Sequence, residues 1–185
     1  MLYLIGGASR AGKSILAGQL CTNHGIPWFS LDVLRMALFR GEPRLGLDPN
    51  RDDQVEAAHL WPIIREMIER LIDDGRDSAI EGVCLRPEDV ASTIAKFKRQ
   101  VTGCFLGYAD ASSSDKVDQI LRHPGPNNWI KEMPASYVTD HVSQNMQVSS
   151  ILRTQCQEFG LAYFDTHRDF DQVILSAVDF LLTAG

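Results

Sequence analysis

The stretch GGASRAGKS (6–14) follows directly on the apolar run LYLI (2–5), and it decides how the rest of the chain is interpreted. Residues 7–14 match the pattern G-x-x-x-x-G-K-[ST] at every fixed position, between a predicted strand and a predicted helix. Glycines let such a loop turn so that several backbone N–H groups point at one phosphate, and the helix that follows adds the positive end of its dipole. The stretch predicts a loop that binds a nucleoside triphosphate; the alternative is a chance glycine-rich turn.

The side chains of this loop have separate expected tasks. Lys13 would bridge the β- and γ-phosphates, and the Ser14 hydroxyl would hold Mg²⁺. ATP and Mg²⁺ are therefore the expected cofactors. The other residues that we expect at the nucleotide are Gly7, Ala8, Ser9, Arg10, Ala11, Gly12 and Ile15.

Short apolar runs alternate with segments of helical spacing along the whole sequence. The predicted strands are 2–5, 26–30, 78–83, 101–109 and 161–166, and the predicted helices are 13–25, 31–41, 55–75, 86–100, 112–123, 137–160 and 169–182. This alternation predicts an α/β fold with a parallel sheet covered on both faces, whose ligands bind beyond the carboxyl ends of the strands. No repeat, low-complexity segment or linker interrupts it, which predicts one domain over residues 1–185.

The composition argues against several classes of function. A formal charge of −6, from 18 basic and 24 acidic residues, is the wrong sign for a general binder of nucleic acids or membrane surfaces. No apolar run reaches the length of a membrane span, and the first residues lack the basic segment of a signal peptide. The four cysteines form no C-x-x-C pair, which predicts reduced core thiols. We therefore expect a cytoplasmic protein with no membrane partner.

The second predicted strand leads into the stretch SLDVLR (30–35). Asp32 lies just past the strand end, where its carboxylate could accept the proton of a substrate hydroxyl that attacks the γ-phosphate. Arg35 follows one helical turn later and could bind an anionic group of the same substrate. The alternative is that Ser30 or Asp32 only caps the next helix.

The third predicted strand ends in the stretch IEGV (80–83). Glu81 there could hold Mg²⁺ through water or orient the acceptor, and Gly82 leaves room for a ligand. Asp165, at the end of the run LAYFDT (161–166), is the rival acid, because it also follows a mostly apolar strand. We prefer Glu81, since an acid followed by glycine is harder to explain as a cap.

Two further regions could supply positive charge to the transferring phosphate. The loop after the second strand contains Arg40, Arg44 and Arg51, of which Arg51 is the predicted substrate contact. A short lid over residues 122–136 would bring Arg122 and Lys131 over the reacting group and exclude water. The alternative is an ordinary solvated loop, and Trp129 within it is the kind of residue that packs a loop down.

The triplet His167-Arg168-Asp169 resembles the catalytic triplet of protein kinases, but the other motifs of that family are missing from the sequence. Its position after the last predicted strand instead predicts a loop near the adenine, with Arg168 at the nucleotide. Arg153, on the long helix after the lid, is a further candidate for contact with phosphate.

Four stretches together resemble the P-loop small-molecule kinases of the nucleoside and nucleotide kinase-like group, and most nearly the 2-phosphoglycerate kinase-like proteins. They are GGASRAGKS (6–14), SLDVLR (30–35), AIEGV (79–83) and YFDT (163–166). The resemblance implies a five-stranded parallel sheet in the order 2-3-1-4-5, ATP and Mg²⁺, and transfer to a hydroxyl or phosphate of a small molecule. It also implies Gly12, Lys13 and Ser14 at the phosphates, Asp32 at the acceptor and Glu81 near the metal. Cys84 and Leu85 depart from the pattern, where a polar substrate contact would be expected.

These patterns favour an ATP-dependent phosphotransferase that acts on a phosphorylated acid, a sugar or a nucleoside. A nucleotide-dependent regulatory ATPase or switch is the alternative from another class. A kinase of nucleotide or nucleic-acid 5′-hydroxyls is a third, although the acidic charge argues against long polymers. An acid with an arginine one turn later, at the end of the second strand, distinguishes the first hypothesis, because a switch needs no acceptor site.

Overall fold

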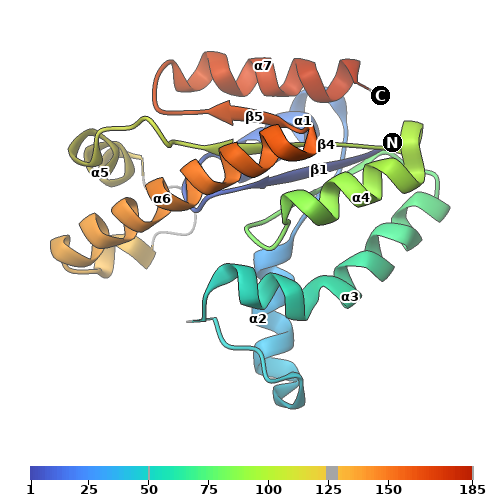
Figure 1. Cartoon of the computed structure of the whole chain (residues 1–185), viewed down its shortest axis with the longest axis horizontal. Helices are drawn as coiled ribbons and strands as arrows, with labels where there is room; N and C mark the ends of the chain where they lie inside the picture. The colour runs from blue at the N-terminus through green and yellow to red at the C-terminus, as the bar shows by residue number, and fades with distance from the viewer. Residues whose placement is uncertain (50, 124–128, 185) are drawn as a thin grey trace.

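Five parallel strands form the centre of the molecule, in a computed structural model that describes residues 1–49, 51–123 and 129–184. Helices lie on both sides of the sheet, which gives three layers (Figure 1). The strands are β1 (Leu2–Gly7), β2 (Trp28–Ser30), β3 (Ser78–Glu81), β4 (Val101–Gly107) and β5 (Ala162–Asp165). Their order, β2-β3-β1-β4-β5, confirms the predicted α/β fold and the order that the resemblance implied.

The helices begin and end within a few residues of the predicted positions. They are α1 (Lys13–His24), α2 (Leu31–Gly41), α3 (Asp53–Asp73), α4 (Pro87–Phe97), α5 (Ser113–Arg122), α6 (Ala135–Phe159) and α7 (Phe170–Thr183). Short 3₁₀ turns occupy Pro43–Leu45, Lys98–Gln100 and Trp129–Glu132. Strand β2 is shorter than predicted: its pairing with β3 begins at Trp28, after Pro27, which has no N–H to donate to a ladder.

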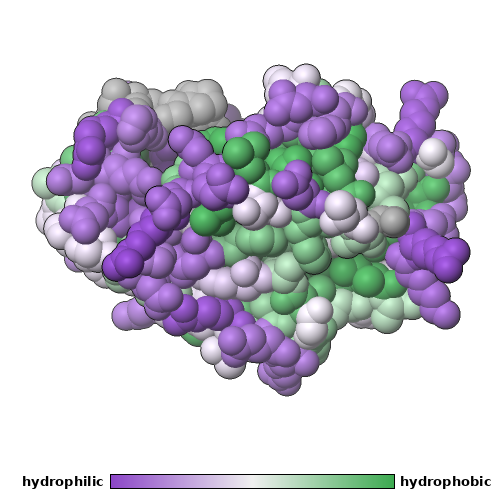
Figure 2. Space-filling view, turned by 90° about the horizontal axis from the view of Figure 1, so that it is seen from above, coloured by the Kyte–Doolittle hydropathy of each residue, from purple (hydrophilic) through white to green (hydrophobic). Residues whose placement is uncertain are grey.

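Strand β1 divides the core into two parts, because successive side chains of a strand point to opposite faces. Leu2 and Leu4 belong to the apolar cluster formed with α3 and α4, whereas Tyr3 and Ile5 belong to the cluster formed with α1 and α7. On the face seen from above Figure 1, where α7 is nearest the viewer, hydrophobic residues lie in the middle and hydrophilic residues around them (Figure 2). None of the described helices combines the length and the apolar character needed to cross a membrane.

The strand register brings the predicted site segments to one edge of the sheet. Ile5 pairs with Glu81, and Glu81 pairs in turn with Ser30 on β2. On the other side, Gly7 pairs with Leu106 of β4. Because all strands are parallel, the loop after β1, the start of α2 and the end of β3 meet at this edge.

Glycine at position 7 is required by a close approach between two strands. Its φ of 138° is unfavourable for other residues, and an added Cβ would lie 2.1 Å from the carbonyl oxygen of Leu106. We expect Gly7→Ala to lower the free energy of unfolding by about 2–4 kcal/mol, measured by urea denaturation. Gly18→Ala is the control, because this position of α1 has open space around it. That change should be neutral or stabilising by up to about 1 kcal/mol, and equal effects of the two changes would contradict the explanation.

Candidate functional site

The loop between β1 and α1 has the conformation of an anion-binding turn. Gly7, Arg10 and Gly12 have positive φ angles of 138°, 61° and 103°, which turn the chain around a central hollow. Lys13 is buried, and its Nζ donates a hydrogen bond to the carbonyl oxygen of Ala8, 2.8 Å away. The lysine therefore arches back over the loop, to the place where the motif predicts phosphate.

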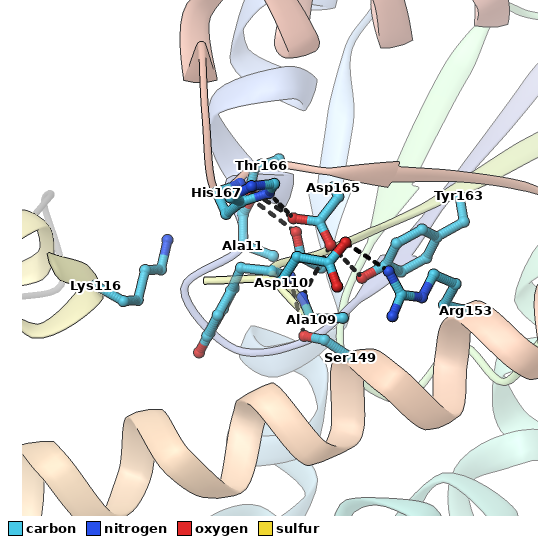
Figure 3. Close-up of polar contacts among 12 residues, drawn as sticks. Ala11, Ala109, Asp110, Lys116, Ser149, Arg153, Tyr163, Asp165, Thr166 and His167 are labelled. Atoms are coloured by element: carbon cyan, nitrogen blue, oxygen red, sulfur yellow. Dashed lines mark hydrogen bonds and ion pairs between the residues drawn. The ribbon is translucent and has the colours of Figure 1, made fainter. Parts of the chain in front are cut away.

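Side chains from distant segments hold this loop in place. The buried Thr166 hydroxyl, just after β5, lies 3.1 Å from the carbonyl oxygens of both Ala11 and Gly107 and can donate to either. Figure 3 shows Thr166 beside Ala11. The Tyr108 hydroxyl donates to the carbonyl oxygen of Ser9 at 2.9 Å. The loop therefore depends on β4 and β5 for its shape.

Helix α6 supplies contacts that the sequence interpretation missed. Asn145 Oδ1 accepts a hydrogen bond from the backbone N–H of Ser9 at 3.0 Å, and His141 Nε2 lies 3.3 Å from Ser9 Oγ. Ser149, one turn further along α6, accepts from the backbone N–H of Tyr108 at 3.1 Å. In the sequence these three polar residues lie at i, i+4 and i+8, a spacing that places them on one face of a helix. Only the folded chain shows that this face contacts Ser9 and Tyr108.

Glu81 lies at the centre of the site and is 2% exposed. Burial raises the pKa of its carboxyl group, while the nearby Lys13 ammonium and hydrogen bonds from Ser30 and Ser14 lower it; Asp32, close by, adds to the rise. The acid predicted at the end of β3 therefore lies beside the lysine and the serine of the loop. Ser30 uses its hydroxyl for Glu81 and makes no side-chain cap bond to α2, so the capping alternative for Ser30 is not observed.

The oxygen atoms around Ser14 fit Mg²⁺ as it binds beside nucleotide phosphates. Mg²⁺ usually takes one or two protein oxygens and completes its shell with water and phosphate. Ser14 and Glu81 supply a hydroxyl and a carboxylate in contact with each other, with Asp32 close by. The described part of the chain holds no cluster of three or more His, Cys, Asp or Glu side chains suited to a metal ion.

Asp165, the rival acid, has structural partners on both carboxylate oxygens. Its Oδ2 accepts from the backbone N–H of Ala109 at 2.9 Å, and the Tyr163 hydroxyl lies 3.4 Å away. Its Oδ1 accepts from the backbone N–H of His167 at 3.2 Å and lies 2.8 Å from His167 Nδ1 (Figure 3). Asp165 thus joins the loops after β4 and β5, which favours Glu81 as the acid beside the metal.

Asp32 and Arg35 lie on the first turns of α2, close to Glu81 and to α3. Asp32 Oδ1 is buried and has no hydrogen-bond partner among the described residues. Arg35 Nη1 forms an ion pair of 2.8 Å with Asp53 at the start of α3, while its buried Nε has no partner there either. Each of the two residues predicted at the acceptor therefore has one buried polar atom without a hydrogen-bond partner in the part of the chain that the structure describes.

The remaining predicted arginines have different surroundings. Arg51 forms an ion pair of 2.9 Å with Glu56, which is fully buried, and it also donates to the carbonyl oxygen of Gly46 at 3.3 Å. These contacts brace the segment that leads into α3. Arg44 pairs with Glu42 at the surface, and Arg153 pairs with Asp110 at 2.7 Å.

The predicted lid is described only in part. Residues 124–128 and the side chains of Trp129 and Lys131 lie outside the described residues. Arg122 is exposed at the end of α5, where its Nε donates to the carbonyl oxygen of Asp118 at 3.2 Å. Its role over the reacting phosphate therefore stays a prediction.

A hollow of about 460 Å³ is lined by two of the predicted residues, Arg122 and Arg168. The other residues around it are Asp110, Ala111, Ser112, Asp115, Lys116, Gln119, His123 and His167. His167 directly follows Thr166, whose hydroxyl contacts Ala11 of the phosphate loop. The contact of Arg168 with the adenine stays a prediction.

No protein-family model matches the sequence, and a search of curated proteins finds no significant match. Solved structures do match it over nearly the whole chain. A gluconokinase from Sinorhizobium meliloti is 18% identical with a TM-score of 0.61, covering 98% of this chain and 91% of that one. A shikimate kinase from Bacteroides thetaiotaomicron is 15% identical with a TM-score of 0.57, covering 99% and 97%. A sugar kinase from Janibacter sp. is 17% identical with a TM-score of 0.51, covering 100% and 97%.

These likenesses show a shared fold, that of the P-loop small-molecule kinases. This chain has the same kind of architecture, a five-stranded parallel sheet between layers of helices. Sequence identities this low establish a shared fold but do not identify a substrate, so the resemblance to 2-phosphoglycerate kinase-like proteins belongs to the proposed function.

Lys116, which lines the hollow, should make the stability of the protein depend on pH. The side chain is 3% exposed, its Nζ lies 4.3 Å from the centre of the Tyr108 ring, and burial lowers its pKa to about 8. The folded protein therefore releases this proton at lower pH than the unfolded chain, so the contribution of Lys116 to stability rises as the pH increases from about 8 towards 10. We expect the wild type to gain about 1–2 kcal/mol relative to Lys116→Met between pH 7.5 and 9.5, measured by urea denaturation.

The matched control for this experiment is Gln144→Met, at an exposed residue of α6 that has no ionisable group. The difference between that variant and the wild type should stay constant over the same pH interval. A constant difference for Lys116→Met as well would show that burial does not perturb Lys116.

Proposed function

We propose that this protein is an ATP-dependent phosphotransferase that moves the γ-phosphate of ATP to a hydroxyl group of a small acceptor. The observation that carries the proposal is the meeting of Lys13, Ser14 and Glu81 with Asp32, whose buried Oδ1 has no partner among the described residues. A buried carboxylate oxygen without a donor is costly, and an acceptor hydroxyl would supply that donor. The proposal takes residues 1–185 as one domain with a lid at 122–136.

The transfer follows from these positions. The acceptor hydroxyl oxygen would attack the γ-phosphorus as the bond to the β-phosphate oxygen breaks and ADP leaves, while Asp32 takes the hydroxyl proton. Lys13 would exchange its bond to Ala8 for the β- and γ-phosphates. Bound Mg²⁺ would neutralise phosphate charge, held by Ser14 with Glu81 beside it. Arg122 from the lid would stabilise the outer oxygens, and Arg168 would contact the base.

The acceptor is proposed to be a small anionic hydroxyl compound. The Arg35 guanidinium, half-used by Asp53, can bind a carboxylate or phosphate through its buried Nε. The structural neighbours are named for gluconate, shikimate and a sugar, which are small hydroxyl compounds. Phosphorylated acids such as 2-phosphoglycerate stay candidates through the resemblance of the motifs, and Arg51 is the second proposed contact.

A nucleotide-dependent switch is the alternative that the loop alone would also support. A switch needs no acceptor site, and so it needs neither a carboxylate nor a guanidinium at the start of α2. The unpartnered atoms of Asp32 and Arg35 therefore favour the transferase.

The first test is release of ADP from ATP and Mg²⁺, alone and with a panel of hydroxy acids, phosphorylated acids, sugars and nucleosides. We expect one compound class to raise the rate strongly. Lys13→Ala should abolish this rise, and Asp32→Asn should lower kcat by about 10²–10⁴-fold, because it removes the proton acceptor. ATP binding, measured by calorimetry, should survive Asp32→Asn within a few-fold.

Asp179→Asn, at an exposed site on α7, is the matched control and should behave as wild type. Full transfer activity in Asp32→Asn would remove Asp32 from the role of base. A slow rate that no compound changes would instead favour the switch.

A further inference from the structure

Two polar residues on one face of α6, His141 and Asn145, contact Ser9 of the phosphate loop. All three polar groups of Ser9 have partners outside the loop: Asn145 binds its N–H at 3.0 Å, His141 lies 3.3 Å from its hydroxyl, and Tyr108 donates to its carbonyl. Asn145 is 7% exposed, and the carbonyl oxygen of Asn145 accepts from the buried Ser149 hydroxyl at 2.7 Å. The next residue after Ser9 is Arg10, which has a positive φ, so the clamp acts where the loop turns.

The hydrogen bonds at Asn145 favour one state of His141. The Ser9 N–H can only donate, so the amide oxygen of Asn145 faces it and the amide nitrogen faces α6. That nitrogen donates to the carbonyl oxygen of His141 at 2.9 Å and lies 3.4 Å from His141 Nε2. Because an amide nitrogen is only a donor, its contact with Nε2 is favourable when Nε2 accepts, as it does in a neutral ring with its proton on Nδ1.

The surroundings of His141 agree with a neutral ring. Burial lowers the pKa of the imidazole, and the Arg10 guanidinium on the phosphate loop lowers it further, while Asp53 at the start of α3 opposes them. Tyr137, on the same helix, stacks on the ring at 6.2 Å. Tyr108 faces Ser9 from the end of β4. A protonated ring would place an N–H against the Asn145 amide and a positive charge near Arg10.

We propose that Asn145 and neutral His141 are positioning residues that hold the phosphate loop in its ATP-binding shape, and that protonation of His141 releases this clamp. The inference rests on the proposed function only in taking ATP as the ligand of the loop.

The pH dependence has a defined direction. The lowered pKa keeps His141 neutral at and above pH 7, so the clamp is complete there. As the pH falls below the range in which histidine ordinarily titrates, the ring takes up a proton and ATP affinity falls beyond the loss that protonation of ATP itself causes. His141→Gln retains a side chain that can accept from Ser9 and cannot titrate, so its ATP affinity should lose this additional dependence on pH.

The experiment measures ATP binding by calorimetry at pH 7.5 and 5.5, together with the His141 pKa by proton NMR. The resonance of His141 among the five histidines is the one missing from His141→Gln. At pH 7.5, Asn145→Ala should weaken ATP binding about five- to tenfold, because the Ser9 N–H loses its partner. Asn145→Asp keeps an acceptor for that N–H but places a negative charge beside the ring, so it should raise the His141 pKa by at least about one unit.

Gln147→Ala, on the exposed side of α6, is the control and should match wild type in every measurement. Wild-type affinity in Asn145→Ala, or an unchanged His141 pKa in Asn145→Asp, would overturn the clamp. If Asn145→Ala does not fold, the Asn145→Asp titration still decides the question. If the wild type binds no ATP, the proposed function fails, whereas the shift of the His141 pKa still tests the contact between the two side chains.

Discussion

A carboxylate buried at the carboxyl ends of three parallel strands organises this site. Glu81 is almost completely removed from water, and an ionised carboxylate there needs donors and positive charge close by. Ser14 and Lys13 supply them from the loop after β1, and Ser30 supplies another donor from the start of α2. The buried Glu81 carboxylate therefore interacts with both the phosphate loop and the start of the helix that carries Asp32.

The phosphate loop obtains its shape from contacts with segments far away in the sequence. Thr166 binds it from β5, Tyr108 from β4 and Asn145 from α6. Backbone N–H groups can converge on an anion only if the peptide planes are already turned toward it. In this protein the strand order places β4 beside β1 and β5 beside β4, and the residues that follow these two strands reach the loop.

Some polar residues of the site have hydrogen-bond or ion-pair partners within the protein, and others have a buried polar atom without a hydrogen-bond partner among the described residues. Asp165 has partners on both oxygens, and Arg51 compensates a fully buried Glu56, so both stabilise loops. Asp32 and Arg35 each leave one buried polar atom without a partner among the described residues. Buried polar atoms without partners are costly, and a ligand that supplies a hydrogen bond to them would recover that cost.

The sequence by itself determined the α/β alternation, the phosphate loop and the acids that follow β2 and β3. These features are local: the loop motif needs particular residues at particular spacing, and strand ends are marked by glycine and by acidic residues. The strand order was reached through the resemblance of the motifs, and the structure confirms it. Only the tertiary structure decided that Glu81 rather than Asp165 contacts Ser14, and that His141 and Asn145 grip Ser9. Those contacts join residues more than sixty positions apart, and no local spacing encodes which side chains meet when helices pack on a sheet.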